Sequence, residues 1–410
     1  MSTALKVWFK DYWLVLLIIA FYIVINWPDA LGRSFYTSNE LPRDLGMLKA
    51  MAAGHFIFLG PDSSIGSFHF GAMYYYLSFP IVWLFRFAPY SLAVCSLLFF
   101  SLTIFTSFIV AKRWWQNELF AYVVIMLMAS SIFTFQFSQY GSNPNYIPFF
   151  SLIFFYCLER LIAGKRSYWY TAILAASFAI SAQLHIVPLL SLPIILLCLL
   201  VTRKLKPTFW DCIIFFAIVL IINAPYLYYE FTHSFVNIRT FSHSVTGGSG
   251  FYTPIWIRLL QYIGFWLVPV ISIHDYFDII YILGMDFIYY VAAALVLLLP
   301  ILKYESTRLL PKQLNLSISS SVKTTLLYWL IIPSLVIVLP SASVNGLRIY
   351  YFLMLYPLIF FLMAWGLLKL WQKGFVRSVA YLCLIYAILQ ITQIYEYRHV
   401  VHGLITWVYG

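Results

Sequence analysis

The sequence predicts an all-α polytopic membrane protein, because it is rich in apolar residues, poor in charge and divided into long apolar runs. Of its 410 residues, 63% are hydrophobic and 10% are charged, and the mean hydropathy is +0.88. A helix needs about 20 apolar residues to cross a ~30 Å hydrocarbon core, and apolar runs recur from Tyr12 onward. No soluble domain of any size fits between the runs, so we expect a single integral membrane domain over residues 1–410.

The first apolar run and the cysteines fit this class. The run from Tyr12 to Trp27 follows Lys6 and Lys10, and no small-residue cleavage site follows it. We therefore expect a retained signal-anchor helix. The cysteines lie inside apolar runs without paired spacing, which favours buried apolar roles over a disulfide framework or a zinc site. They are Cys95, Cys157, Cys198, Cys212 and Cys383.

The net charge of +11 is concentrated in basic clusters near the ends of apolar runs. The positive-inside rule places such clusters in the cytoplasm, so the cations indicate a membrane topology with a cytoplasmic N-terminus rather than nucleic-acid binding. This topology requires Phe70–Phe87 and Trp256–Ile273 to be interfacial or re-entrant. The bundle then has about 11 spans, or about 13 if both segments cross. The clusters are Lys6/Lys10, Lys112/Arg113, Lys165/Arg166, Arg203/Lys204/Lys206, Lys303–Lys323 and Lys369/Lys373/Arg377.

The polar, non-basic segments fall mostly on the opposite, extracytoplasmic face. Polar backbone at membrane depth is tolerated where it lines a wet cavity, so several such segments together favour a site, although each alone is equally well explained as a turn. We expect residues 28–69 to form the first extracytoplasmic loop and carry the reactive residues. Residues 230–255, which are rich in glycine, should form a lid, and residues 303–324 a cytoplasmic loop. The remaining polar segments are Ser138–Asn145, Gln183–His185 and Ser341–Arg348.

An amphipathic helix is predicted in the first loop, within NELPRDLGMLKAMAAGH (Asn39–His55). Its apolar residues follow a helical spacing, so the helix should lie on the outer membrane surface. Glu40, Arg43 and Asp44 gather at its N-terminal end. Acidic residues there favour the helix dipole by about 0.3–1 kcal/mol, and this structural role competes with a catalytic one. The apolar stripe consists of Leu41, Leu45, Leu48 and Ala52.

The next stretch, GPDSSIGSFHFGAMYYYL (Gly60–Leu77), predicts a backbone-rich turn that leads into an aromatic helix. Its glycines permit close approach of the backbone, and its three consecutive tyrosines suit the membrane interface. His69 either hydrogen-bonds locally or binds a metal with Glu40 or Asp44. One histidine does not indicate a metal site, so the sequence leaves the metal open. The residues in question are Gly60, Gly66 and Gly71, Tyr74, Tyr75 and Tyr76, and the hydrogen-bonding Ser63, Ser64 and His69.

The order of these motifs resembles that of bacterial glycosyltransferase family 39-like membrane proteins. This family belongs to the GT-C superfamily, which includes the protein O-mannosyltransferases and the lipid A aminoarabinose transferases. The chain departs from the family pattern because Glu40 replaces the usual aspartate, Ala72 replaces a usual proline, and an expected arginine and tryptophan are missing before Asn143. The matching segments are Glu40–Asp44, Gly60–Tyr76, NPN at Asn143–Asn145, QLH at Gln183–His185, YYEFTH at Tyr228–His233 with Asn237, and RIYYFLMLYPL at Arg348–Leu358.

The resemblance implies a GT-C-like bundle and an inverting glycosyltransferase on the extracytoplasmic face of the inner (plasma) membrane. Such an enzyme takes a sugar from a polyprenyl-phosphate donor and transfers it to a lipid, glycan or protein acceptor. Glu40 is the expected base and Asp44 its partner or alternate, while Arg43 and Arg348 would hold the donor phosphate through paired hydrogen bonds. The expected partners are the donor, the acceptor and membrane lipids, and a divalent metal is compatible but not indicated. The other substrate-binding positions that the resemblance implies are Ser63, Ser64, His69, Tyr74, Asn143, Asn145 and His185.

Two other classes compete with this reading. A transporter or lipid-linked sugar flippase would also be helical and basic inside, but such proteins tend to carry ionisable groups near the bilayer midplane and internal repeats. Here the ionisable groups cluster at the ends of the runs and no repeat is visible. A non-catalytic scaffold would not need Glu40, Arg43 and Asp44 together.

Overall fold

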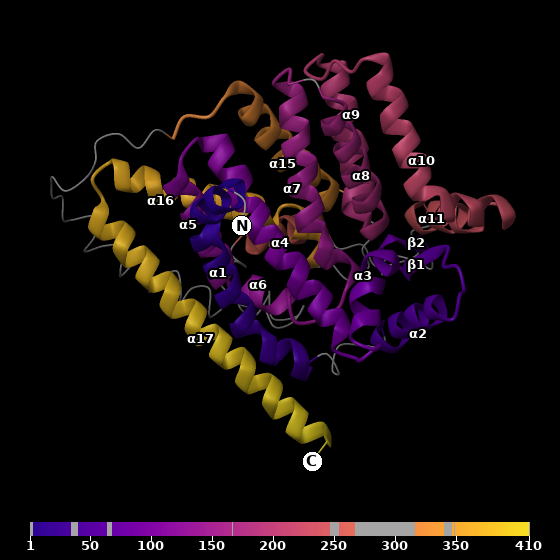
Figure 1. Cartoon of the computed structure of the whole chain (residues 1–410), viewed down its shortest axis with the longest axis horizontal. Helices are drawn as coiled ribbons and strands as arrows, with labels where there is room; N and C mark the ends of the chain where they lie inside the picture. Colours follow the sequence, from indigo (N-terminus) through magenta and orange to yellow (C-terminus); the bar gives the residue numbers. More distant parts are fainter. Residues whose placement is uncertain are drawn as a thin grey trace.

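The computed structural model describes residues 3–33, 40–63, 68–165, 167–246, 254–266, 316–339, 347 and 349–409. Within these ranges the chain forms 15 α-helices, two short 3-10 helices and one two-stranded hairpin. Helices α7, α8, α9 and α10 lie side by side in one half of the molecule, and α1, α5, α16 and α17 lie in the other (Figure 1). The predicted all-α polytopic class is therefore confirmed.

The element bounds follow the apolar runs closely. They are α1 (Thr3–Arg33), α2 (Glu40–Ala52), β1 (Leu59–Asp62), β2 (His69–Gly71), α3 (Met73–Leu84), α4 (Ser91–Trp115), α5 (Glu118–Ser130), α6 (Ile132–Phe137), η1 (Asn143–Tyr146), α7 (Ile147–Ile162), α8 (Tyr168–Leu184), α9 (Ile186–Val201), α10 (Phe209–Thr232), α11 (Val236–Thr246), α12 (Ile255–Phe265), α15 (Ser320–Val338), η2 (Ile349–Met354), α16 (Tyr356–Gln372) and α17 (Val376–Tyr409).

Six helical segments among the described residues are long and apolar enough to cross a membrane. Helix α10 shows most clearly how such a segment meets lipid. Its 24 residues extend about 36 Å, and large side chains such as Phe216 (61% exposed) and Ile221 (71%) face outward. The segments are Tyr12–Gly32, Ser91–Trp115, Asn143–Ile162, Phe209–Thr232, Ser320–Val338 and Arg377–Ile394.

Helix α2 confirms the predicted amphipathic helix of the first loop. Leu45 and Leu48 are buried, as the predicted stripe requires, and α2 packs against α3. Helix α3 has 12 residues and extends about 18 Å, too short to cross the hydrocarbon core. This length agrees with the prediction that Phe70–Phe87 does not span. Of the other predicted non-spanning segment, only the part up to Trp266 lies within the described residues.

Two of the predicted loop regions contain helix. Helix α1 continues through Pro28 to Arg33, whereas the first loop was expected to begin at Pro28. Membrane helices tolerate proline because neighbouring groups satisfy the freed backbone, so this proline did not mark an end. Residues 236–246 of the predicted lid form helix α11, while the glycine-rich residues 247–253 lie outside the described part, as do residues 303–315 of the predicted cytoplasmic loop.

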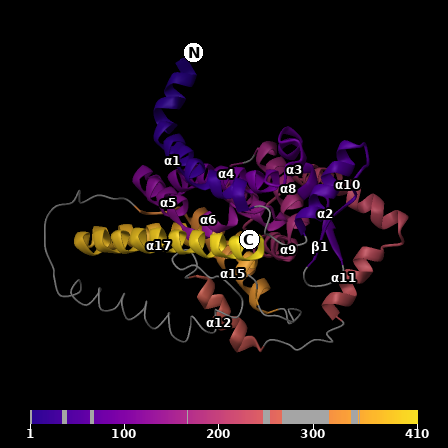
Figure 2. The same ribbon diagram turned by 90° about the horizontal axis from the view of Figure 1, so that it is seen from below.

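The hairpin of β1 and β2 lies at one end of the bundle. It contacts α3, α8 and α10, beside the C-terminal ends of α8 and α10 (Figure 1). In the view from below, α2 and β1 lie on the same side of the molecule as α10 and α11 (Figure 2). Because α9 runs back from this end, the basic segment that follows it, Arg203 to Lys206, lies at the opposite end of the helices. The charge pattern predicts that the hairpin end is extracytoplasmic.

Candidate active site

The hairpin is the centre around which the candidate site is built. Its strands are antiparallel, with Leu59 opposite Gly71 and Asp62 opposite His69. A Cβ atom on Gly60 would collide with the carbonyl group of Gly71, and one on Gly71 would collide with the Gln183 side chain of α8. The prediction of close backbone approach is therefore confirmed at Gly60 and Gly71, and the approaching groups belong to the protein itself.

A carboxylate network joins α2, β1 and α3. Asp44 is 2% exposed, and its Oδ1 accepts hydrogen bonds of 2.8 Å from the Arg43 Nε and from the Tyr75 hydroxyl. The guanidinium of Arg43 also forms an ion pair with Asp62 of β1. Arg43 therefore lies between two carboxylates, and the network fixes the N-terminal half of α2 against the hairpin.

Burial controls the charge of Asp44. Loss of solvent raises the pKa of this carboxyl, and it outweighs the hydrogen bonds from Arg43 and Tyr75, which act in the opposite direction. Arg43 stays charged, since the guanidinium titrates far above neutral pH. The network is thus a buried acid held by one cation and one hydroxyl.

Glu40 is the first residue of α2, one helical turn before Asp44, and its side chain is exposed.

Tyr74 lies at the start of α3 and is completely buried beside Tyr75 and Tyr146. Within the described residues its hydroxyl has no hydrogen-bond partner. Tyr74 and Tyr75 therefore face the protein interior and not the lipid, because α3 is packed against α2, α4 and α8.

A second cluster surrounds His69. The side-chain amide of Asn237, on α11, receives the His69 backbone N–H at 2.6 Å and donates to the His69 carbonyl at 2.8 Å. The Nδ1 of His69 lies 3.2 Å from the Gly60 carbonyl oxygen, which satisfies the local hydrogen-bonding prediction. Glu230 is fully buried nearby at the end of α10. Its Oε2 accepts a 3.4 Å bond from the Ile238 backbone, whereas its Oε1 has no partner among the described residues.

The third cluster lies where α8 meets α9. His185 is buried between Phe70 of β2 and Tyr351 of η2, and its Nδ1 accepts the Val187 backbone N–H at 3.3 Å. Asn143 donates to the Leu184 carbonyl beside it. His185 therefore both caps α9 and joins the hairpin to the η2 segment.

The remaining predicted residues are less closely connected. Asn145 is buried, and its amide donates at 2.8 Å to the carbonyls of Phe137 and Tyr140, so it holds the turn before η1. Ser63 is buried, and its backbone N–H closes the hairpin on the Phe68 carbonyl at 2.7 Å. Ser64 and Arg348 lie outside the described residues.

Three polar residues that the structure places at the hairpin are not among the predicted site residues: Asp62, Glu230 and Asn237. Glu230 and Asn237 belong to a segment that matches the family pattern, but neither was given a role. Glu230 carried a usable signal, since it is the one acidic residue near the end of a 24-residue apolar helix, where a charge is costly and often functional. The pairing of Asn237 with His69 could not be predicted, because the two residues are 168 positions apart in the chain. Among the described residues, no three His, Cys, Asp or Glu side chains gather as metal ligands.

The comparisons with known proteins bear on the fold. No protein-family model matches the chain, and no curated protein sequence matches it. The crystal structure of ArnT from Cupriavidus metallidurans bound to undecaprenyl phosphate is similar, with a TM-score of 0.61, 12% sequence identity and coverage of 91% of this chain. The chain spans 63% of the length of ArnT. At this identity the likeness establishes the fold, and the protein is a polytopic membrane protein with a GT-C-like helical bundle.

Proposed function

We propose that the protein is an inverting glycosyltransferase that uses a polyprenyl-phosphate sugar on the extracytoplasmic face of the inner membrane. The observation that carries the proposal is the network in which three charged residues of the first loop, Arg43, Asp44 and Asp62, meet Tyr75 of α3 at one end of the bundle. The GT-C-like fold supports it, and so does the solved ArnT structure, whose bound molecule is a polyprenyl phosphate.

The reaction needs a base, a leaving group and a fixed direction of attack. The base removes the proton from an acceptor hydroxyl or amine, and the acceptor atom forms a bond to the anomeric carbon of the sugar. The bond between that carbon and the phosphate oxygen breaks on the opposite face, so the configuration inverts and polyprenyl phosphate leaves. Positioned acid–base catalysis contributes roughly 10²- to 10⁴-fold to such a step.

We assign the base to Glu40 and positioning to Asp44. Glu40 is exposed and can reach an acceptor, whereas Asp44 is buried and engaged by Arg43 and Tyr75. Arg43 already contacts two carboxylates, so we propose that it orients α2 and that Arg348 holds the phosphate. His69, His185 and Asn143 would line the same end of the bundle.

Sugar transfer from a labelled polyprenyl-phosphate sugar to membrane acceptors tests the proposal. Glu40→Gln keeps the size of the side chain but cannot accept a proton, so transfer should fall roughly 10²- to 10⁴-fold while donor binding is retained. Glu118→Gln is the matched control, because Glu118 is an exposed carboxylate paired with Lys112 at the other end of the bundle.

Three outcomes separate the alternatives. If Asp44→Asn lost transfer while Glu40→Gln kept full transfer, Asp44 would be the base and Glu40 the positioning residue. Equal loss in Glu118→Gln would indicate a general defect and remove the support for Glu40. Transfer unaffected by either substitution in the first loop would contradict the transferase and favour a flippase.

A further inference from the structure

A large cavity opens at the end of the helices opposite the hairpin. Its volume is about 920 Å³, and it lies between the ends of α7 and α9 and the beginnings of α8, α10 and α15. Along α10, Asp211 at the cavity and Glu230 at the hairpin are 19 residues apart, which corresponds to about 29 Å of helix. The cavity is therefore separate from the candidate active site and faces the other side of the membrane.

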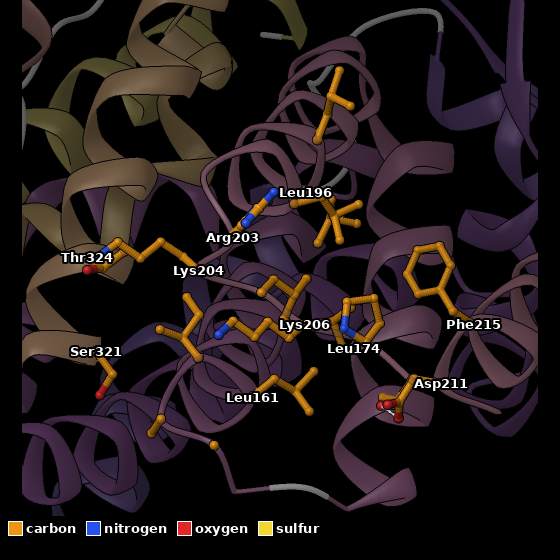
Figure 3. Close-up of a pocket in the computed structure, with 18 of the residues that line it drawn as sticks. Leu161, Leu174, Leu196, Arg203, Lys204, Lys206, Asp211, Phe215, Ser321 and Thr324 are labelled. Carbon is orange, nitrogen blue, oxygen red and sulfur yellow. Dashed lines mark hydrogen bonds between the residues drawn. The ribbon is translucent and has the colours of Figure 1, made fainter. Parts of the chain in front are cut away.

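The inner part of the cavity is apolar. Figure 3 shows Leu161, Leu174, Leu196 and Phe215 around it, each from a different helix. Leu197 and Phe216, which also line the cavity, are exposed on the outside of the bundle. The cavity thus opens sideways, toward the region that hydrocarbon chains occupy.

Three cations stand at the mouth: Arg203, Lys204 and Lys206 (Figure 3). The end of α9 places them there, because the Lys204 N–H bonds back to the Leu199 carbonyl at 2.9 Å and the chain turns at Arg203. Arg203 adopts a φ of 55°, a left-handed conformation that favours glycine at a helix end. An arginine therefore occupies a position where the backbone alone would favour glycine.

No acidic side chain in the part of the chain that the structure describes forms an ion pair with these three cations. Asp211 also lines the cavity, but both of its carboxylate oxygens accept other hydrogen bonds. Oδ1 accepts from Thr171 at 2.8 Å, and Oδ2 accepts from the backbone and hydroxyl of Thr208 in a capping box at the start of α10. Among the described residues, the lining therefore carries three cations against the single carboxylate of Asp211, and its net charge is positive.

We propose that this cavity binds an anionic phospholipid of the adjacent leaflet. The phosphate would lie against Arg203, Lys204 and Lys206, and an acyl chain would enter through the lateral opening between α9 and α10. Basic pockets between membrane helices suit phosphate head groups, and each cation near an anionic lipid contributes about a fivefold gain in binding. An apolar cavity with a cationic mouth matches both parts of such a lipid.

Native mass spectrometry of the full-length protein with added phosphatidylglycerol or phosphatidylcholine tests the proposal. The wild type should retain phosphatidylglycerol in preference to phosphatidylcholine, and Arg203→Gln/Lys204→Gln/Lys206→Gln should weaken that retention on the order of 100-fold. The matched control is Lys369→Gln/Lys373→Gln/Arg377→Gln, which removes three cations from the turn between α16 and α17, away from the cavity. This control should retain the lipid normally.

A second measurement reports whether lipid occupies the cavity. Cys212 lines it, so in a variant that keeps only this cysteine, phosphatidylglycerol should slow maleimide labelling and phosphatidylcholine should not. Equal retention of both lipids, or equal loss in the control variant, would overturn the proposal. Displacement of phosphatidylglycerol by a much lower concentration of polyprenyl phosphate would also overturn it and assign the cavity to the isoprenoid lipid.

Discussion

The Tyr75 hydroxyl donates to Oδ1 of Asp44 over 2.8 Å, across the contact between α3 and α2. Arg43 donates to the same oxygen from within α2. Both of these hydrogen bonds favour the charged form of the carboxylate. Burial of the carboxylate acts in the opposite direction and favours the neutral form. Small changes in this network should alter the protonation of Asp44 without unfolding the bundle.

Tyr75→Phe tests this balance. It removes a hydrogen bond to the charged form, so the pKa of Asp44 should rise further. A hydrogen bond to a charged group contributes about 1.5–3 kcal/mol, which corresponds to about 1–2 pH units. If the charged form of Asp44 supports transfer, the acidic limb of the pH–rate profile should move upward by about this amount.

Tyr76→Phe is the matched control, because the Tyr76 hydroxyl donates over 2.8 Å to the Ile57 carbonyl and not to a carboxylate. Its pH profile should stay in place. If the pH–rate profile moved equally in both variants, the shift would not be caused by the hydrogen bond to Asp44.

Stability should depend on pH through the same residue. Burial raises the pKa of Asp44 above its unfolded value, so its contribution to folding is fully present below about pH 4 and is lost as pH rises through the folded pKa. Asp44→Asn does not titrate. The Tm of the wild type relative to Asp44→Asn should therefore fall as pH rises above about 4, and a constant difference between the two Tm values would contradict the raised pKa.

Gly60→Ala should open the hairpin. Its new Cβ atom meets the backbone carbonyl of Gly71, which cannot move away while the strands stay paired. We expect a loss of more than about 2 kcal/mol in unfolding free energy. The matched control is Gly46→Ala, in the middle of α2, where the Cβ meets nothing within 4 Å and alanine should stabilise the helix by up to about 1 kcal/mol. Thermal melts of the purified variants measure both effects, and equal melting temperatures would contradict the close approach.

The two ends of α10 test the topology. In a cysteine-free background, a membrane-impermeant maleimide applied from outside should label His233→Cys and leave Pro207→Cys unlabelled. Both positions are exposed, and they lie just beyond the two ends of the 24-residue helix. Labelling of Pro207→Cys alone would place the basic clusters outside and reverse the predicted orientation.

The sequence was sufficient for the features that depend on local pattern. Hydrophobic runs predicted the membrane class, and the spacing of Leu45 and Leu48 predicted α2 with its buried face. The burial of Asp44 was not predictable, because it depends on Tyr75 and Asp62, which approach only when the hairpin docks. The continuation of α1 from Pro28 to Arg33 was not predictable from hydropathy, because the apolar run ends at Trp27 and the added residues include the charged Asp29 and Arg33.

The pairing of Asn237 with His69 has a consequence for association between molecules. A side-chain amide has the same donor and acceptor as a peptide group, and Asn237 presents both to the outer edge of β2, where a third strand would otherwise pair. Unpaired strand edges are templates for intermolecular sheet growth. One asparagine on a helix thus occupies the outer edge of β2 at His69, and a strand of a neighbouring copy could pair there only by displacing it.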